Sequence, residues 1–332
     1  MEMGKGDISR ADDAPQQQAA RYDNVTLHTA FMPEMFGTHH AKMLILFRHD
    51  DSAQVVIHTA NMIAKDWTNL TNGVWRSPRL PLLNPTNVAA AAAAAGMTPA
   101  TIGSGARFKA DLLAYLRAYN ARRDVCRALV DALAKHDFSA VRGALVASVP
   151  GRHDVDGDPQ ATRWGWAGLQ RALRSVPCRQ ATGTPPEIAV QVSSVATLGP
   201  TDIWLRRTLF EALSASKTTT RDSDDEKEND DDSSGTTTAT TTTASKPEFR
   251  ILFPTPDEIR ASLDGYASGA SIHMKTQSAQ QQKQLAYMRP LLCHWANDTA
   301  KGVCEFFALP LTIPNPSLFT FLTPPRWHVQ CL

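Results

Sequence analysis

Short apolar runs alternate with helical patterns along this chain. The runs Met43–Phe47 and Val55–Thr59 are rich in branched residues, and the polar segment Arg48–Gln54 separates them. This pattern predicts a hairpin of two buried strands. Three further stretches have the composition of strands, at 144–149, 188–196 and 249–253.

Amphipathic helices are predicted between these strands. The first helix carries apolar residues at helical spacing, which are Phe108, Leu112, Leu116 and Tyr119. A second helix is predicted from Asp124 to about Lys135, and a third between Asp202 and Ser214. Because strands and helices are interleaved, the sequence favours a layered α/β fold.

Four segments are not expected to pack into the folded core. Residues 1–23 and 215–246 are predicted to be disordered, and the second of them joins an acidic run to a Thr-rich run without any apolar residue larger than alanine. The tract Ala89–Ala95 is predicted to be a variable surface loop. The segment 303–332 is rich in proline, nearly uncharged and without a clear period.

Composition narrows the class of protein. The five cysteines are scattered, in neither a disulfide framework nor a zinc-binding pattern, and they favour a reducing compartment. No secretory signal is expected in residues 1–23, and prolines interrupt the apolar stretch 303–323, so we expect a soluble intracellular protein without a membrane span. Outside the acidic run 221–232, the chain has 32 basic and 25 acidic residues, an excess of seven positive charges that is compatible with a polyanionic ligand.

The densest polar cluster is Gly37–Lys42, directly before the predicted strand at Met43. In an extended chain, His40 and Lys42 point to the same face. An imidazole beside an ammonium suits a phosphate, because the histidine can attack phosphorus while the lysine stabilises the phosphoryl oxygens. The amide of Asn61, after the next predicted strand, could add a donor. Taken alone, such a triplet is more often an ordinary strand edge with a solvent-facing lysine.

The surrounding sequence changes this interpretation. The segments Phe36–Met43, Val55–Asn61, Asp66-Trp67 and Gly73–Pro78 closely resemble the first catalytic motif of the tyrosyl-DNA phosphodiesterase family, a DNA-repair branch of the phospholipase D superfamily. The resemblance covers about residues 25–300. Its further matching segments are 108–116, 150–152, 192–195, 198–199, 253–254, 265–266 and 281–295. Phe47 stands where the wider superfamily has an aspartate, a departure that the tyrosyl-DNA branch shares and that disfavours a phospholipase.

The resemblance implies an α/β, phospholipase D-like layered fold with mixed sheets flanked by helices. The first repeat would occupy residues 24–140, after a disordered N-terminus at 1–23. A partial second repeat would occupy 141–302, with the insert 215–246, and the tail 303–332 resembles nothing in the family.

The resemblance also implies an activity, the hydrolysis of 3′-phosphotyrosyl and other 3′-blocked DNA ends through a phosphohistidine. Partners would be single- or double-stranded DNA, with no membrane, no metal and no cofactor, and the protein would be a nuclear monomer. The catalytic residues would be His40 as nucleophile, with Lys42 and Asn61 binding the phosphoryl oxygens. The DNA-binding residues would be Phe36, stacked on a base, and Ser193 and Ser194 at the backbone. Asn72 stands where the family often has glutamine, one methylene longer, and would be a further phosphate contact.

The family builds its site from two HxK motifs, and the second histidine protonates the leaving group and activates water. The other HxK of this sequence, His273–Lys275, follows Gly265–Ala270, a stretch that in the family precedes the second motif by several tens of residues. No apolar strand follows it, since Thr276–Gln284 is mostly Gln, Ser and Lys, so we predict that a surface helix begins there instead, with an approach of His273 to DNA left open. We therefore expect a truncated product with impaired turnover. The alternatives are a non-catalytic protein that binds DNA 3′ ends and, less favoured, a phosphatidyl-transferring enzyme.

Overall fold

The computed structural model describes residues 21–27, 40–68, 70, 72–84, 86, 100–119, 126–151, 153, 161–176, 186–216 and 247–294. Phe36, the tract Ala89–Ala95 and the tail 303–332 lie outside these residues. So does nearly all of the two segments predicted to be disordered, 1–23 and 215–246.

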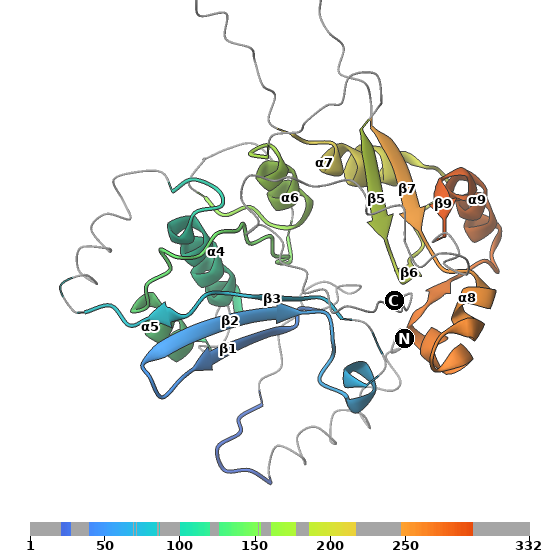
Figure 1. Cartoon of the computed structure of the whole chain (residues 1–332). Helices are drawn as coiled ribbons and strands as arrows, with labels where there is room; N and C mark the ends of the chain where they lie inside the picture. Colours follow the sequence, from blue (N-terminus) through green and yellow to red (C-terminus); the bar gives the residue numbers. More distant parts are fainter. Residues whose placement is uncertain are drawn as a thin grey trace, which may run out of the picture.

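The first sheet of the described residues is antiparallel. It contains β1 (Met43–Phe47), β2 (Ser52–His58), β3 (Val74–Arg76) and β4 (Leu80–Pro81). β2 lies between β1 and β3 (Figure 1). It also pairs with β4 near its start. The 3₁₀ helix η1 (Ala64–Trp67) connects β2 to β3.

The predicted hairpin of β1 and β2 is confirmed. In its turn, the Asp50 carboxylate accepts hydrogen bonds from the hydroxyl and the backbone N–H of Ser52, at 2.6 and 3.2 Å. Asp51 has a φ of 56°, a left-handed conformation that Asp tolerates better than most residues. The predicted burial holds for β2 but is wrong for the end of β1, where Leu46 and Phe47 are exposed. The reason is that, in the part of the chain described, β1 pairs only with β2.

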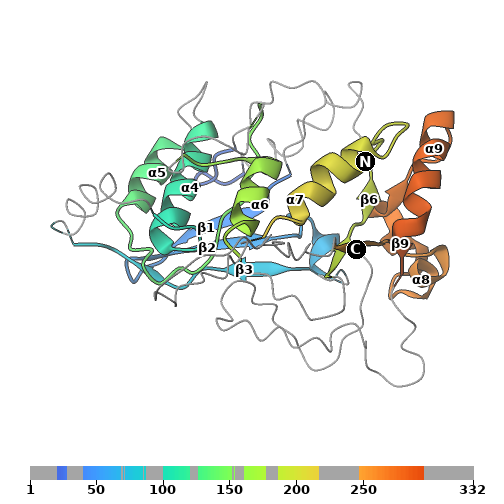
Figure 2. The same cartoon turned by 90° about the horizontal axis from the view of Figure 1, so that it is seen from above.

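Two helices pack against this sheet and confirm the first two predicted helices. α4 (Gly105–Ala118) and α5 (Arg127–Ala134) cover one face, as the view from above shows (Figure 2). Ser104 caps α4, since its side chain accepts a hydrogen bond from the backbone N–H of Arg107. The apolar stripe meets the sheet in one core cluster that includes Ala53, Val55, Leu80, Phe108, Leu112, Leu116, Val130 and Leu133.

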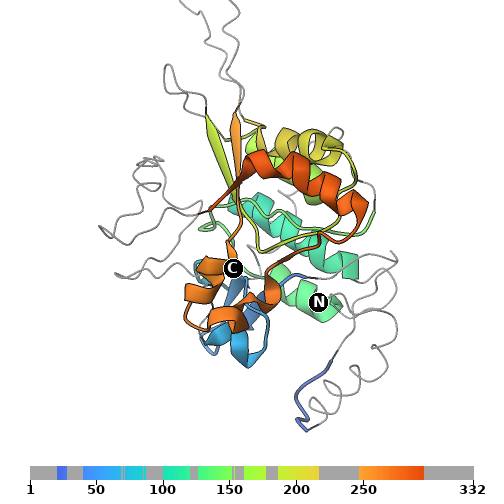
Figure 3. The ribbon, with the colours of Figure 1, turned by 90° about the vertical axis from the view of Figure 1, so that its right-hand side faces the viewer.

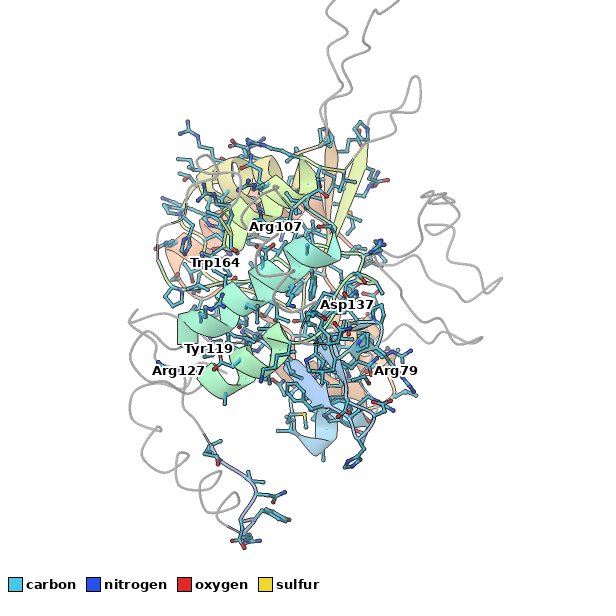
Figure 4. All side chains as sticks on the ribbon, turned by 90° about the vertical axis from the view of Figure 1, so that its left-hand side faces the viewer. Arg79, Arg107, Tyr119, Arg127, Asp137 and Trp164 are labelled. Atoms are coloured by element: carbon cyan, nitrogen blue, oxygen red, sulfur yellow. The ribbon has the colours of Figure 1, made fainter. Side chains whose placement is uncertain are left out.

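A buried polar network joins α4 to the segment that leads into α6 (Gly165–Leu173). Arg107 and Asp111 form an ion pair at 2.9 Å, and both side chains are more than nine-tenths buried. Thr162 donates a hydrogen bond to Asp111 at 2.7 Å, and Arg107 donates one to the carbonyl of Ala161 at 3.0 Å. Figure 4 labels Arg107 and Trp164 near α4, and the ring of Trp164 lies 6.3 Å from that of Tyr115.

The second half contains a parallel sheet. β7 (Glu248–Leu252) lies between β5 (Glu187–Gln191) and β9 (Leu292–Cys293). A separate parallel pair joins β6 (Ser194–Val195) to β8 (His273–Met274). The strands predicted at 188–196 and 249–253 are therefore confirmed, although the first is interrupted at 192–193.

The strand predicted at 144–149 is wrong. This segment alternates between exposed and half-buried residues, which mimics a strand in the sequence. In the described chain it joins no sheet, and the carbonyl of Ala147 accepts a hydrogen bond from the backbone N–H of Gly165 at 2.8 Å. It is an irregular connection from α5 toward α6.

The remaining helices flank the parallel sheet. The helix predicted between Asp202 and Ser214 is confirmed as a π-helical turn, η3 (Leu205–Phe210), continued by α7 (Glu211–Leu213). The others are α8 (Pro256–Ala261), η4 (Gly265–Ser271), α9 (Ala279–Met288) and η5 (Arg289–Leu291). α9 confirms the surface helix predicted to begin in Thr276–Gln284, and Ser278 and Gln281 form a capping box at its start. A second core cluster is built on Val195, Leu205, Ile251 and Met288.

Candidate functional site

The His40–Lys42 motif lies directly before β1, beside the end of β2. The carbonyl of Lys42 accepts a hydrogen bond from the backbone N–H of His58 at 3.1 Å, so the ladder of the hairpin extends to Lys42. The Lys42 ammonium donates a hydrogen bond to the carbonyl of His40 at 3.0 Å. His40 is exposed. The strand therefore fixes the backbone of the motif and leaves the imidazole at the surface.

Asn61 is held in place by Asp66. One carboxylate oxygen of Asp66 accepts hydrogen bonds from both the backbone N–H and the side-chain amide of Asn61, each at 2.7 Å. The indole N–H of Trp67 donates to the carbonyl of Asn61, also at 2.7 Å. Asp66 is buried, which strengthens these bonds. The Asn61 amide keeps a second N–H, and this donor can face a ligand.

Asp66 also acts on the motif electrostatically. Partial burial lowers the pKa of Lys42 below its usual value, and the attraction of the Asp66 carboxylate opposes this effect. The carboxylate thus links the two groups, since it orients Asn61 and favours the charged form of Lys42. Asp66 has no assigned role in the sequence analysis, although the match at Asp66-Trp67 pointed to it.

His58 is a second residue that sequence reasoning missed. His58 is 9 % exposed, and neither nitrogen of its imidazole has a hydrogen-bond partner in the described chain. The ring of Trp67 lies 5.5 Å from the imidazole and covers it. An apolar run ending in His-Thr carries no signal that distinguishes this residue from any other at a strand end.

Both ends of the Asn72 side chain are engaged within the fold. Its amide donates to the carbonyl of Asp66 at 2.7 Å, and its oxygen accepts a hydrogen bond from the Thr59 hydroxyl at 2.9 Å. Asn72 therefore braces the loop that carries Asp66. A contact of Asn72 with DNA stays a prediction.

Ser193 and Ser194 lie in the second half, at β6. Ser194 is exposed and stands opposite His273 in the parallel pair, and the carbonyl of Ser193 accepts a hydrogen bond from the backbone N–H of His273 at 3.2 Å. The buried side chain of Gln284 in α9 holds the loop after β6. Its amide donates to the carbonyl of Ala196 and its oxygen accepts from the backbone N–H of Leu198, both at 2.8 Å.

One hydrogen bond connects the Asn61 loop to the second half. The Lys65 ammonium, in η1, donates to the carbonyl of Ala267, in η4, at 2.6 Å. Figure 3 shows the blue η1 segment next to the orange α8–η4 segment. Phe36 lies outside the described residues, so its place relative to these groups stays a prediction.

The described residues contain no group of three His, Cys, Asp or Glu side chains that could hold a metal ion. Among the same residues, no helix is both long enough and apolar enough to cross a membrane.

The fold belongs to the phospholipase D-like class. The structure is similar to that of yeast tyrosyl-DNA phosphodiesterase, with a TM-score of 0.50, 15% sequence identity and coverage of 82% of this chain and 55% of that chain. A mutant of the yeast enzyme gives a TM-score of 0.53 at 18% identity, covering 85% of this chain and 57% of that chain. These yeast structures have the phospholipase D-like fold, and the fold class predicted from the sequence is confirmed.

The family follows from the sequence match. The model of the tyrosyl-DNA phosphodiesterase family matches residues 3–310, so this chain belongs to that family. A probable tyrosyl-DNA phosphodiesterase of Schizosaccharomyces pombe is 26% identical over 321 residues, covering 82% of this chain and 53% of the relative. Tyrosyl-DNA phosphodiesterase 1 of Drosophila melanogaster is 30% identical over 254 residues, covering 75% of this chain and 37% of the relative. The chain thus spans about half, or less, of the length of these relatives.

Proposed function

We propose that this chain processes DNA 3′ ends blocked by a phosphodiester-linked group, with a 3′-phosphotyrosyl end as the leading substrate, in nuclear DNA repair. Family membership supports the DNA substrate. The observation that carries the proposal is the Asp66 carboxylate, which positions Asn61 and attracts the charge of Lys42 beside the exposed His40. An ammonium and an amide that are linked through one carboxylate can together stabilise the charge of a phosphoryl group.

The first step is a displacement at phosphorus. A ring nitrogen of His40 forms a bond to phosphorus while the bond from phosphorus to the tyrosyl oxygen breaks, and the electron pair leaves on the phenolate. Lys42 and Asn61 stabilise the charge on the phosphoryl oxygens. Because phenols have a pKa of about 10, the phenolate leaves without full prior protonation. Formation of the phosphohistidine therefore does not depend strictly on a second histidine.

The second step is hydrolysis of the phosphohistidine. The oxygen of a water molecule bonds to phosphorus, the bond to the His40 nitrogen breaks, and the DNA keeps a 3′ phosphate. Activation of this water needs a general base, which contributes roughly a hundred- to ten-thousand-fold. The printed sequence has one HxK motif directly before an apolar strand. We therefore expect the 332-residue chain to accumulate the covalent adduct rather than turn over rapidly.

The test uses a labelled oligonucleotide with a 3′-phosphotyrosyl end and a denaturing gel. The wild-type chain should give a labelled protein band, and the amount of covalent adduct should be less than one per protein chain. His40→Ala should abolish this band. His49→Ala changes an exposed histidine of the hairpin turn and is the matched control, with an unchanged band. An adduct that persists in His40→Ala removes His40 as the nucleophile. DNA binding without any adduct in the wild type favours the alternative, a protein that binds 3′ ends without chemistry.

A further inference from the structure

His58 is a buried histidine that the proposed reaction does not use. The residue is 9 % exposed, and within the described part of the chain neither nitrogen of its imidazole has a hydrogen-bond partner. Buried polar atoms are nearly always paired, because an unpaired one keeps the full cost of its lost hydration. A phenylalanine of similar shape would avoid this cost. The imidazole therefore keeps the capacity to bond a group that reaches it.

His58 lies directly across the hairpin from Lys42. The neighbouring pair of the register, Met43 and Ile57, packs against the core cluster. One residue further along, the backbone N–H of His58 donates to the carbonyl of Lys42 at 3.1 Å, so these two side chains lie together on the opposite face of the hairpin. Residues opposite one another in an antiparallel pair have Cβ atoms about 4.5–5.5 Å apart. The lysine side chain is long enough to bring its ammonium to the imidazole.

The other described neighbours of the imidazole do not compete for it. On the far side of β2, His58 pairs with Val74, whose side chain has no polar atom. The ring of Trp67 covers the imidazole at 5.5 Å, but its indole N–H is donated to the carbonyl of Asn61. Because Trp67 shields this position from water, a hydrogen bond formed beneath it is strengthened.

We propose that His58 is a positioning residue for Lys42, whose ammonium donates a hydrogen bond to the imidazole when a phosphoryl group is bound. This inference rests on the proposed function. An ammonium has three N–H donors, and a neutral imidazole has one acceptor nitrogen. One donor of Lys42 reaches the carbonyl of His40 at 3.0 Å, which leaves one for His58 and one for a phosphoryl oxygen. Two acceptors of the protein then fix the direction in which the third N–H of Lys42 points.

The test compares two labelled oligothymidylates by fluorescence anisotropy on the full chain. One ends in a 3′ phosphate esterified to methanol, a much poorer leaving group than a phenolate, and the other ends in a 3′ hydroxyl. The ratio of their affinities reports on the binding of the terminal phosphoryl group. His58→Phe keeps a ring against Trp67 but removes the acceptor. It should reduce the ratio about tenfold, the effect of one hydrogen bond to a charged group, and His58→Gln, which keeps an acceptor, should recover part of the loss.

Thermal unfolding separates this role from a structural one. His58→Phe replaces unpaired polar atoms by apolar ones, so its melting temperature should equal or exceed that of the wild type. His136→Phe is the matched control, because His136 is another buried histidine of the first half and its ring nitrogen bonds the carbonyl of Ala132 at 3.0 Å. The control should lose stability and keep the affinity ratio of the wild type.

A double-mutant cycle with Lys42→Met decides whether His58 acts through Lys42. In the Lys42→Met background, His58→Phe should have no further effect on the affinity ratio. A wild-type ratio in His58→Phe overturns the proposal, and so does an equal loss with and without Lys42. If His58→Phe does not fold, His58→Leu takes its place in the cycle, and the same two results decide.

The cycle also separates this inference from the proposed reaction. If the wild type forms no covalent adduct with a 3′-phosphotyrosyl end while His58 and Lys42 are coupled in binding, the reaction is wrong and the role of His58 stands. If the adduct forms and the two residues are not coupled, the role of His58 is wrong and the reaction stands.

Discussion

Replacement of Asp66 by asparagine tests the coupling between Asn61 and Lys42 directly. The Asp66 carboxylate accepts two hydrogen bonds at 2.7 Å from Asn61, and the residue is 9 % exposed. Hydrogen bonds to a charged group contribute about 1.5–3 kcal/mol each, against about 0.5–1.5 kcal/mol for neutral pairs. Asp66→Asn keeps the shape and one oxygen acceptor but loses the charge. We therefore expect the free energy of unfolding to fall by about 2–3 kcal/mol.

The same substitution should change the pH dependence of the reaction. The attraction of Asp66 raises the pKa of Lys42 against the effect of burial, so its removal lowers the pKa of Lys42 further. Lys42 then loses its proton at a lower pH, and the alkaline decline of adduct formation should move to lower pH in Asp66→Asn.

The assay combines thermal unfolding with single-turnover adduct formation from pH 6 to 10. Asp131→Asn, at an exposed position of α5, is the control and should change neither quantity. A variant Asp66→Asn with the wild-type melting temperature and the wild-type pH profile refutes the role given to Asp66. A loss of stability without a shift of the pH profile limits Asp66 to supporting the loop and refutes its action on Lys42.

Three further predictions concern the framework. Asp111→Ala leaves the buried Arg107 cation unpaired and should cost about 3–5 kcal/mol in chemical denaturation, whereas Asp111→Ala combined with Arg107→Met should recover part of that loss. Gln284→Leu removes both hydrogen bonds to the loop after β6 and should cost about 2 kcal/mol while increasing amide hydrogen exchange in that loop. Lys65→Met removes the bond to Ala267, and since this contact is exposed, the melting temperature should hardly change while protease cleavage near η4 becomes faster.

Local patterns predicted most of the elements. The helical stripe at Phe108 and the apolar runs of the hairpin gave correct elements because each signal is contained in a short window and its apolar face meets a single core. The prediction of a strand at 144–149 was wrong because it rested on side-chain alternation alone. Alternation describes how side chains are exposed, but a strand also needs a neighbour for its backbone, and none of the described strands pairs there.

The candidate site likewise contains residues that the sequence predicted and one, Asp66, that it did not. His40, Lys42 and Asn61 were predicted because the family resemblance marks them within a stretch of 22 residues, and their catalytic roles stay a prediction. Asp66 follows Asn61 by only five residues, and the two are joined by hydrogen bonds. No sequence spacing predicts, however, that one carboxylate interacts with both an amide and a lysine.

The pairing of β6 with β8 was hidden from the sequence for a physical reason. His273 was rejected as the second catalytic histidine because no apolar strand follows it, and two residues, His273 and Met274, are too few to show a strand period. They form a strand because their backbone pairs with that of Ser193 and Ser194. His273 lies 79 residues after its partner Ser194. Met274 also packs against a core that is built from other elements. Pairing at that separation is set by the packing of the whole second half and not by local preference. An HxK sequence that no apolar run follows can therefore still form a strand, because a segment far away in the sequence supplies the partner for its backbone.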